Sequence, residues 1–154
     1  MTSRVYVALR VRATPARAFA AFTEEIGDWW QASPLFETTP RPGRLSFETG
    51  PEGRLVETRA GGKVFEIGRI RAWEPPHRLV FSWRQASFPP DLQTEVEVRF
   101  EAVGHETRVS IEHRGFDRIP AGHAARHTFP DQVLLARLGE YWQAQIRAMG
   151  SRLP

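Results

Sequence analysis

Residues 96–111 read VEVRFEAVGHETRVSI, and this stretch decides the fold. Apolar and polar side chains alternate over residues 96–100 and again over 109–111, as they do on β-strands with one buried face. Gly104 and His105 lie between the two runs, and a short turn that contains glycine is typical of a β-hairpin. The hairpin has one apolar face, so another element of the chain must cover it.

A long helix is predicted from Asp131 to Met149. Its apolar side chains recur at spacings of three and four residues and form a broad stripe, which is typical of an amphipathic helix. They are Leu134, Leu135, Leu138, Tyr141, Trp142, Ile146 and Met149. A helix of this length spans roughly 28 Å at about 1.5 Å per residue. We therefore expect it to cross the sheet and cover its apolar face.

The N-terminal part of the chain predicts one strand followed by two short helices. Apolar residues alternate with other residues from Arg4 to Arg12. Thr14 and Pro15 then indicate the start of a helix, because proline at the first helical position loses no hydrogen bond. A second short helix is expected from Glu24 to Trp30. Further strands are predicted at residues 45–48, 54–59, 63–73 and 79–84. The order of elements predicts an α+β domain with an antiparallel sheet of about six to seven strands.

The composition is that of one folded domain, which we place at residues 1–154. Hydrophobic residues make up 41% of the chain and charged residues 25%, as in ordinary globular proteins. The chain has no cysteine, which excludes disulfides, thiolate metal sites and a cysteine nucleophile. Its start, MTSRVYVALR, lacks the apolar region of a signal peptide, and no run approaches the ~20 apolar residues of a membrane span. We therefore expect a cytoplasmic protein with no membrane span.

Charge and motifs argue against several classes of function. The net charge is +3 and the isoelectric point about 10.1, but the arginines stand singly among glutamates instead of clustering. We therefore expect no nucleic-acid partner. His123 and His127 have the spacing of a zinc site on a helix, but no glutamate stands between them and no third ligand is evident, so no metal is expected. Phosphate-binding and dinucleotide-binding glycine motifs are absent, and no cofactor is expected.

Three stretches, in order along the chain, are similar to a known family. Residues 11–30 run from VRATPARAF to the pair WW, residues 68–83 contain EPP and a strand that ends in tryptophan, and residues 96–116 end in HRGF. Together they resemble the activator of heat-shock protein 90 ATPase homologue family, in the START-like (SRPBCC) superfamily of polyketide cyclases and lipid-transfer domains. The resemblance implies a helix-grip fold, in which a curved antiparallel sheet packs against a long C-terminal helix. Residues 116–130 are longer than this pattern implies and are expected to form a loop.

The helix-grip fold implies an apolar cavity between the curved sheet and the C-terminal helix. The residues expected to line it are Trp30, Phe47, Phe65, Phe81, Trp83, Phe100, His113, Phe116, Leu138, Tyr141 and Trp142. The same aromatic residues would fill a closed core in the alternative interpretation, because protein interiors are close-packed. The leading hypothesis is the binding of a small apolar or aromatic ligand in this cavity.

Two alternative functions stay open. His113 continues the inward face of its strand, and a histidine in a cavity can act as the acid or base of a cyclase, dehydratase or hydrolase. The family name implies the second alternative, a module that binds a chaperone. We favour a role without catalysis and assign no catalytic residue. A homodimer is left open.

Overall fold

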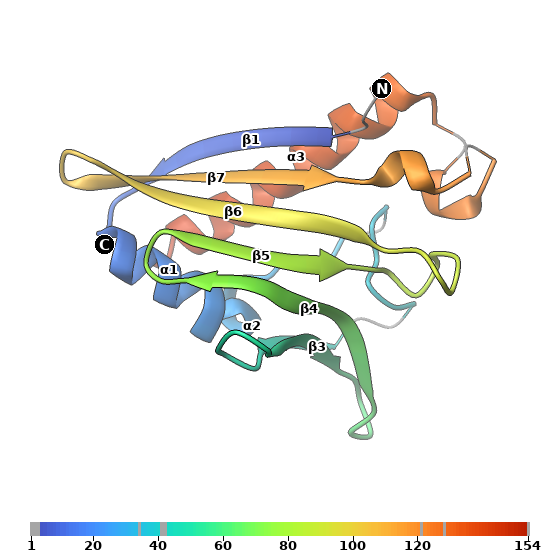
Figure 1. The fold of residues 1–154 in the computed structure, drawn as a ribbon, viewed down its shortest axis with the longest axis horizontal. Helices are drawn as coiled ribbons and strands as arrows, with labels where there is room; N and C mark the ends of the chain where they lie inside the picture. Colours follow the sequence, from blue (N-terminus) through green and yellow to red (C-terminus); the bar gives the residue numbers. More distant parts are fainter. Residues whose placement is uncertain (1–3, 34, 41–42, 121, 128, 154) are drawn as a thin grey trace.

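The computed structural model describes residues 4–33, 35–40, 43–120, 122–127 and 129–153. One antiparallel sheet of seven strands curls around three α-helices, which lie on its inner face (Figure 1). The strand order is β1-β7-β6-β5-β4-β3-β2. The strands are β1 Arg4–Val11, β2 Arg44–Phe47, β3 Arg54–Thr58, β4 Val64–Glu74, β5 Arg78–Trp83, β6 Thr94–Val103 and β7 Glu106–Arg114. The helices are α1 Pro15–Glu24, α2 Ile26–Trp29 and α3 Asp131–Gly150, with 3₁₀ turns η1 Phe116–Arg118 and η2 Ala124–Arg126.

This architecture confirms the predicted α+β helix-grip fold. The two short helices follow β1, and the predicted C-terminal helix is α3, which lies across the sheet (Figure 1). The side chain of Thr14 accepts a hydrogen bond from the backbone of Arg17 (3.2 Å), with Pro15 at the first helical position. The expected loop at residues 116–130 contains the two 3₁₀ turns. No helix in the described ranges is long and apolar enough to cross a membrane.

The β6–β7 hairpin has the register that the alternation predicts. Val98 lies opposite Ile111 and Phe100 opposite Val109, so the apolar side chains share the inner face. Gly104 has a φ of 60° in the turn, a conformation that glycine adopts readily. β1 then pairs with β7 along its whole length. β1, β7 and β6 therefore form one side of the inner face of the sheet.

Strand β4 bends where it passes β5, and a glycine allows the close approach. A Cβ atom built on Gly68 would lie 1.6 Å from the carbonyl oxygen of Ser82. The strand cannot move away without losing hydrogen bonds, since the Ser82 hydroxyl accepts from the backbone N–H of Arg69 (2.9 Å). A side chain at position 68 is therefore incompatible with this sheet geometry.

We expect Gly68→Ala to lower the free energy of unfolding by about 1–3 kcal/mol, because the added methyl group must push two paired strands apart. Chemical denaturation measures the change. Gly122→Ala is the matched control, since a Cβ atom there has no neighbour within 4 Å. Equal stability of the two variants would contradict the close approach of β4 to β5.

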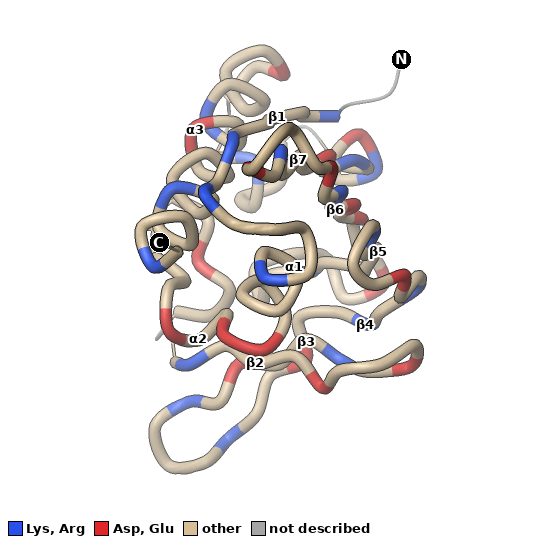
Figure 2. The backbone as a smooth tube through the Cα atoms, turned by 90° about the vertical axis from the view of Figure 1, so that its left-hand side faces the viewer, with Lys and Arg blue, Asp and Glu red and all other residues tan. Residues whose placement is uncertain are grey.

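The outer face of the sheet carries ion pairs. Glu97 on β6 contacts the guanidinium groups of Arg78 (2.9 Å), Arg99 (2.7 Å) and Arg114 (3.1 Å). Burial alone would raise the pKa of Glu97, but hydrogen bonds from Arg78 and Arg114 hold this pKa below its ordinary value. Figure 2 shows acidic and basic positions interspersed along the chain. The arginines of this outer cluster are thus neutralised within the sheet.

Candidate functional site

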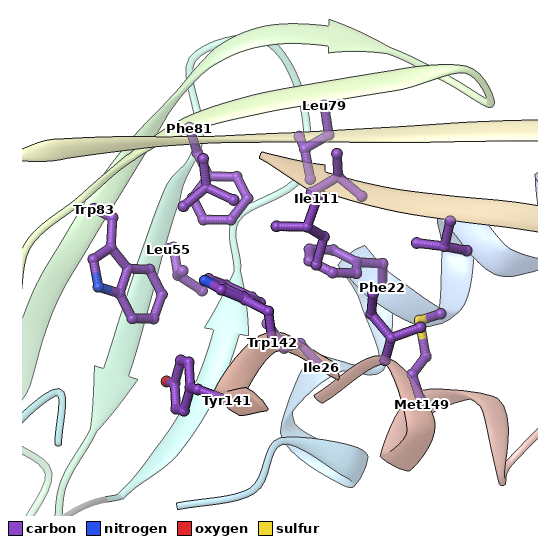
Figure 3. Packing of buried hydrophobic residues seen from close by; sticks show 14 of the residues in the cluster. Phe22, Ile26, Leu55, Leu79, Phe81, Trp83, Ile111, Tyr141, Trp142 and Met149 are labelled. Atoms are coloured by element: carbon purple, nitrogen blue, oxygen red, sulfur yellow. The ribbon is translucent and has the colours of Figure 1, made fainter. Parts of the chain in front are cut away.

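The space between the sheet and α3 is occupied by tryptophan rings. Trp83 comes from β5, Trp142 from α3 and Trp30 from the end of α2, and each pair of ring centroids is 5.7 Å apart. Trp83 and Trp142 are almost fully buried, and Figure 3 shows them facing one another across this space. Rings at these distances are in direct contact. In this conformation the three side chains fill the centre of the space in which the cavity was predicted.

The structure brings most of the predicted ligand-binding residues together. The tryptophan cluster continues through Trp30, Trp83, His113, Phe116, Tyr141 and Trp142. A second group packs around Phe22 and contains Phe47, Phe81 and Phe100. Leu138 is buried on α3. Phe65 is partly buried against the core, with the guanidinium of Arg84 5.5 Å from its ring centroid, and it has no ring contact with either group. As contacts of a ligand, all eleven residues stay predictions.

His113 is buried and both of its ring nitrogens are paired. Nδ1 accepts a hydrogen bond from Nε1–H of Trp142 (3.0 Å), so the ring proton is on Nε2 and points to the hydroxyl of Thr94 (2.7 Å). That hydroxyl donates to the carbonyl oxygen of Trp83 (3.0 Å). Burial, and then the charge of Arg114, lowers the pKa of His113 to about 3, which keeps the ring neutral. This arrangement gives His113 a structural role and leaves no nitrogen free for acid or base chemistry.

A small polar pocket lies beside the tryptophan cluster, and we name it the Glu57 pocket. Its volume is about 60 Å³, enough for one or two water molecules. It is lined by Trp30, Ala32, Ser33, Phe36, Glu37, Thr38, Gly43 and Glu57. The lining of the pocket therefore contains both aromatic rings and a carboxyl group.

Glu57 is the polar floor of this pocket. Its side chain is fully buried on β3, where one carboxyl oxygen accepts from the hydroxyl of Thr38 (2.8 Å) and the other from the backbone N–H of Gly43 (2.8 Å). Among the described residues, no arginine, lysine or histidine forms an ion pair with it. A buried carboxyl group without a cation is uncommon, because a protein interior solvates it poorly. Each oxygen keeps capacity for a further donor.

Tyr141 on α3 packs against the aromatic wall of the same pocket. Its ring packs against Trp30 (5.8 Å) and Phe36 (5.4 Å), both of which line the pocket. The hydroxyl is buried, and no hydrogen-bond partner for it exists among the residues that the structure describes. Burial raises the pKa of Tyr141 and the charge of Glu57 adds to this, so the hydroxyl keeps its proton; the side-chain amide of Gln145 lies near enough to oppose the shift but outside hydrogen-bond geometry. The residue with the unpaired hydroxyl thus packs against two residues that line the pocket of Glu57.

Residues 31–33 and 35–40, which we name the cover segment, close this side of the molecule. Gln31 binds Gln145 of α3 twice, because its N–H donates to the side-chain oxygen (2.9 Å) and its carbonyl accepts from the side-chain nitrogen (2.7 Å). Further contacts include the hydrogen bonds from Gln85 Nε2 to Glu37 O (3.0 Å) and from Ala86 N to Thr38 O (2.8 Å), and a contact of His127 Nε2 with Leu35 O. The segment is held by these polar contacts and by apolar ones, since Phe36 is buried in the core beneath it and Leu35 packs against the core.

The two histidines considered as zinc ligands, His123 and His127, contact backbone atoms. His123 Nδ1 accepts from the N–H of Ala125 (3.0 Å) at the start of η2, while His127 reaches the cover segment. Among the described residues no group of three histidine, cysteine or acidic side chains is arranged to hold a metal.

A curled antiparallel sheet that grips a long C-terminal helix, with two short helices after its first strand, defines a helix-grip protein of the α+β class. Residues 12–149 match the family model described as Activator of Hsp90 ATPase homolog 1-like protein. The chain therefore belongs to this family, and the resemblance inferred from its sequence is confirmed.

Several solved structures are similar to this chain. A protein of Mesorhizobium loti has 19% sequence identity and a TM-score of 0.66, with 96% of this chain and 94% of that one covered. An HSP90 activator from Plasmodium falciparum has 19% identity and a TM-score of 0.62, with 94% and 91% covered. An anthrahydroquino-gamma-pyrone synthase complexed with SUM has 28% identity and a TM-score of 0.52, with 96% and 86% covered. No curated protein matches the chain significantly.

Proposed function

We propose that this protein binds a small aromatic ligand between the sheet and α3, and that a hydroxyl group of the ligand occupies the Glu57 pocket. The observation that carries the proposal is that two incompletely paired buried groups adjoin the same aromatic residues. The carboxyl of Glu57 lines a pocket with Trp30 and Phe36, and the ring of Tyr141, whose hydroxyl is unpaired, packs against both of them. A buried polar group left unpaired lowers stability by about 1–3 kcal/mol. A ligand hydroxyl that accepts from Tyr141 and donates to Glu57 would pair both.

Binding at this place requires movement of the cover segment. The Glu57 pocket has a volume of about 60 Å³, which is far below the roughly 300 Å³ or more of a ligand pocket. Trp30 and Phe36 occupy the adjoining space and lie beside or on the cover segment, which hydrogen bonds attach to α3 and to residues 85–86. An aromatic ligand would replace the ring contacts that Phe36 or Trp30 loses when it moves. The buried apolar area lost by the side chain would therefore be largely restored by the ligand.

One of the comparisons supports the binding of a small molecule in this fold, although the protein concerned is itself an enzyme. The similar synthase was solved as a complex with a bound molecule, and that likeness extends over 96% of this chain. Catalysis by His113 finds no support in the geometry, because both ring nitrogens are engaged. The similarity to the HSP90 activator, at 19% identity, supports the fold alone and does not by itself favour chaperone binding.

The test uses 1-naphthol, a neutral aromatic probe with one hydroxyl group, and naphthalene, which has none. We expect 1-naphthol to bind the wild-type protein, and Tyr141→Phe or Glu57→Gln to weaken this binding about tenfold, the effect of one lost hydrogen bond. Binding of naphthalene should be unchanged in both variants. Isothermal titration calorimetry measures each affinity, and Glu140→Gln on the exposed face of α3 is the control.

A stability measurement separates this role from a structural one. Tyr141→Phe removes a hydroxyl that has no partner, so the variant should be more stable than the wild type by about 1 kcal/mol while it binds 1-naphthol more weakly. Unchanged affinity for 1-naphthol in both variants, or no binding by the wild type, would refute the proposal.

A further inference from the structure

A second pocket lies at the C-terminal end of α3, next to the end of β1, and we name it the arginine pocket. Its volume is about 450 Å³. It is lined by Leu9, Arg10, Val11, Arg12, Ile146, Arg147, Gly150, Ser151 and Leu153. Figure 2 shows basic positions near the C-terminus and the adjacent end of β1. None of these residues belongs to the Glu57 pocket or to the tryptophan cluster.

The floor of the arginine pocket is apolar. Val11, Ile146 and Leu153 are buried there. Gly150 brings the helix end close to β1, because a Cβ atom at this position would lie 3.3 Å from a methyl carbon of Val11. The surface between strand and helix is therefore a concave apolar strip, and it suits an aliphatic chain.

The rim of the pocket carries uncompensated positive charge. Arg12 and Arg147 form no ion pair with any described residue, and Arg10 has only a long contact with Glu106 (3.9 Å) in which both side chains are exposed. Among the residues that the structure describes, none that lines the pocket carries a side-chain carboxylate. Elsewhere on the sheet the pattern is the opposite, since a carboxylate such as Glu97 contacts three guanidinium groups at once. Three arginines around one concave surface attract an anion.

The end of α3 does not supply the missing negative charge. A helix C-terminus attracts cations through its unpaired carbonyl groups, but several of these carbonyls are used here. The backbone N–H groups of Ser151, Arg152 and Leu153 donate to the carbonyls of the last helical turn at 3.0–3.1 Å, and the Ser151 hydroxyl donates to Ala148 (2.8 Å). The guanidinium groups on the rim therefore remain available to an external anion.

We propose that the arginine pocket binds an organic anion with an aliphatic chain, whose charged group is held by Arg12 and Arg147 and whose chain lies on the floor. Guanidinium groups bind carboxylates and phosphates through two parallel hydrogen bonds, and the apolar floor adds affinity for the attached chain. The charged group is accordingly a carboxylate or a phosphate, either of a free amphiphile or of a lipid headgroup.

Decanoate is the probe for the test, and decanol is its neutral counterpart. Decanoate should bind the wild-type protein and lose at least tenfold in affinity in the Arg12→Gln/Arg147→Gln double variant, while decanol should bind weakly to both. Added salt should weaken the binding of decanoate, because the rim is exposed. Arg71→Gln, an exposed arginine without an ion pair on β4, is the matched control and should bind as the wild type does.

Two further experiments locate the binding site of the anion and identify its source. Glu57→Gln should leave the affinity for decanoate unchanged, which separates the arginine pocket from the ligand site proposed above. Co-sedimentation with phosphatidylglycerol vesicles that the double variant loses would assign the anion to a lipid headgroup, and decanoate binding without co-sedimentation would assign it to a free amphiphile. Equal decanoate affinity in wild type and double variant, or binding of neither probe nor vesicles by the wild type, would overturn the proposal.

Discussion

Replacement of Trp142 by alanine is expected to lower the free energy of unfolding by about 3–5 kcal/mol, the cost of truncating a fully buried aromatic side chain. The ring contacts Trp30 and Trp83 at 5.7 Å, and its N–H donates to His113, so neither packing nor pairing can be restored by small shifts. Denaturant-induced unfolding measures the loss. Tyr6→Ala, at an exposed aromatic residue of β1, should change stability by less than about 0.5 kcal/mol.

The Trp142→Phe variant separates volume from hydrogen bonding. Phenylalanine keeps much of the ring volume but leaves Nδ1 of His113 without its donor, so we expect an intermediate loss of about 1–3 kcal/mol. If Trp142→Ala were as stable as the wild type, the interior would have to be loosely packed, and a ligand would then enter without displacing the cover segment.

Acidification is expected to destabilise the protein well above the range in which carboxyl groups titrate. The pKa of His113 is about 3 in the folded protein and about 6.5 when unfolded, so between these values the unfolded chain binds more protons. Stability therefore falls as the pH falls below about 6.5. The slope is about 1.4 kcal/mol per pH unit, which gives a loss of roughly 2 kcal/mol by pH 5. Glu97, whose pKa is lowered, loses its contribution only as the pH falls below its ordinary value of 4.5.

Unfolding curves recorded between pH 7 and pH 5 test this slope. His113→Gln removes the titrating ring, so its stability, although lower, should vary little over this interval. His105→Ala, in the exposed turn between β6 and β7, should keep the wild-type slope. A wild-type slope in His113→Gln would mean that another group is responsible for the acid sensitivity.

The sequence was sufficient to predict the fold because its main elements have clear local periods. The hairpin alternates strictly on both strands, and α3 shows an apolar stripe over five turns, so neither needed tertiary information. The proline at the start of α1 fixed that boundary as well. Local patterns and tertiary structure agree in these elements.

The candidate site was harder to predict, because its key features depend on contacts between distant segments. Leu55, Val56 and Glu57 are consecutive and all buried, so Glu57 does not follow the alternation that would mark it as inward or outward. Its partners Thr38 and Gly43 come from a segment without a clear period. Tyr141 was predicted from the stripe of α3, but the missing partner of its hydroxyl is visible only in three dimensions.

The pairing of β1 with β7 also has a consequence for how the chain folds. Arg4 lies opposite Arg114, so β1 pairs with a strand about one hundred residues further along the chain, and it has no other neighbouring strand in the described sheet. Closing so long a loop is entropically costly and slows folding. During translation the apolar side of β1 thus stays exposed until β7 and then α3 have left the ribosome, and in that interval the nascent chain is most prone to aggregate.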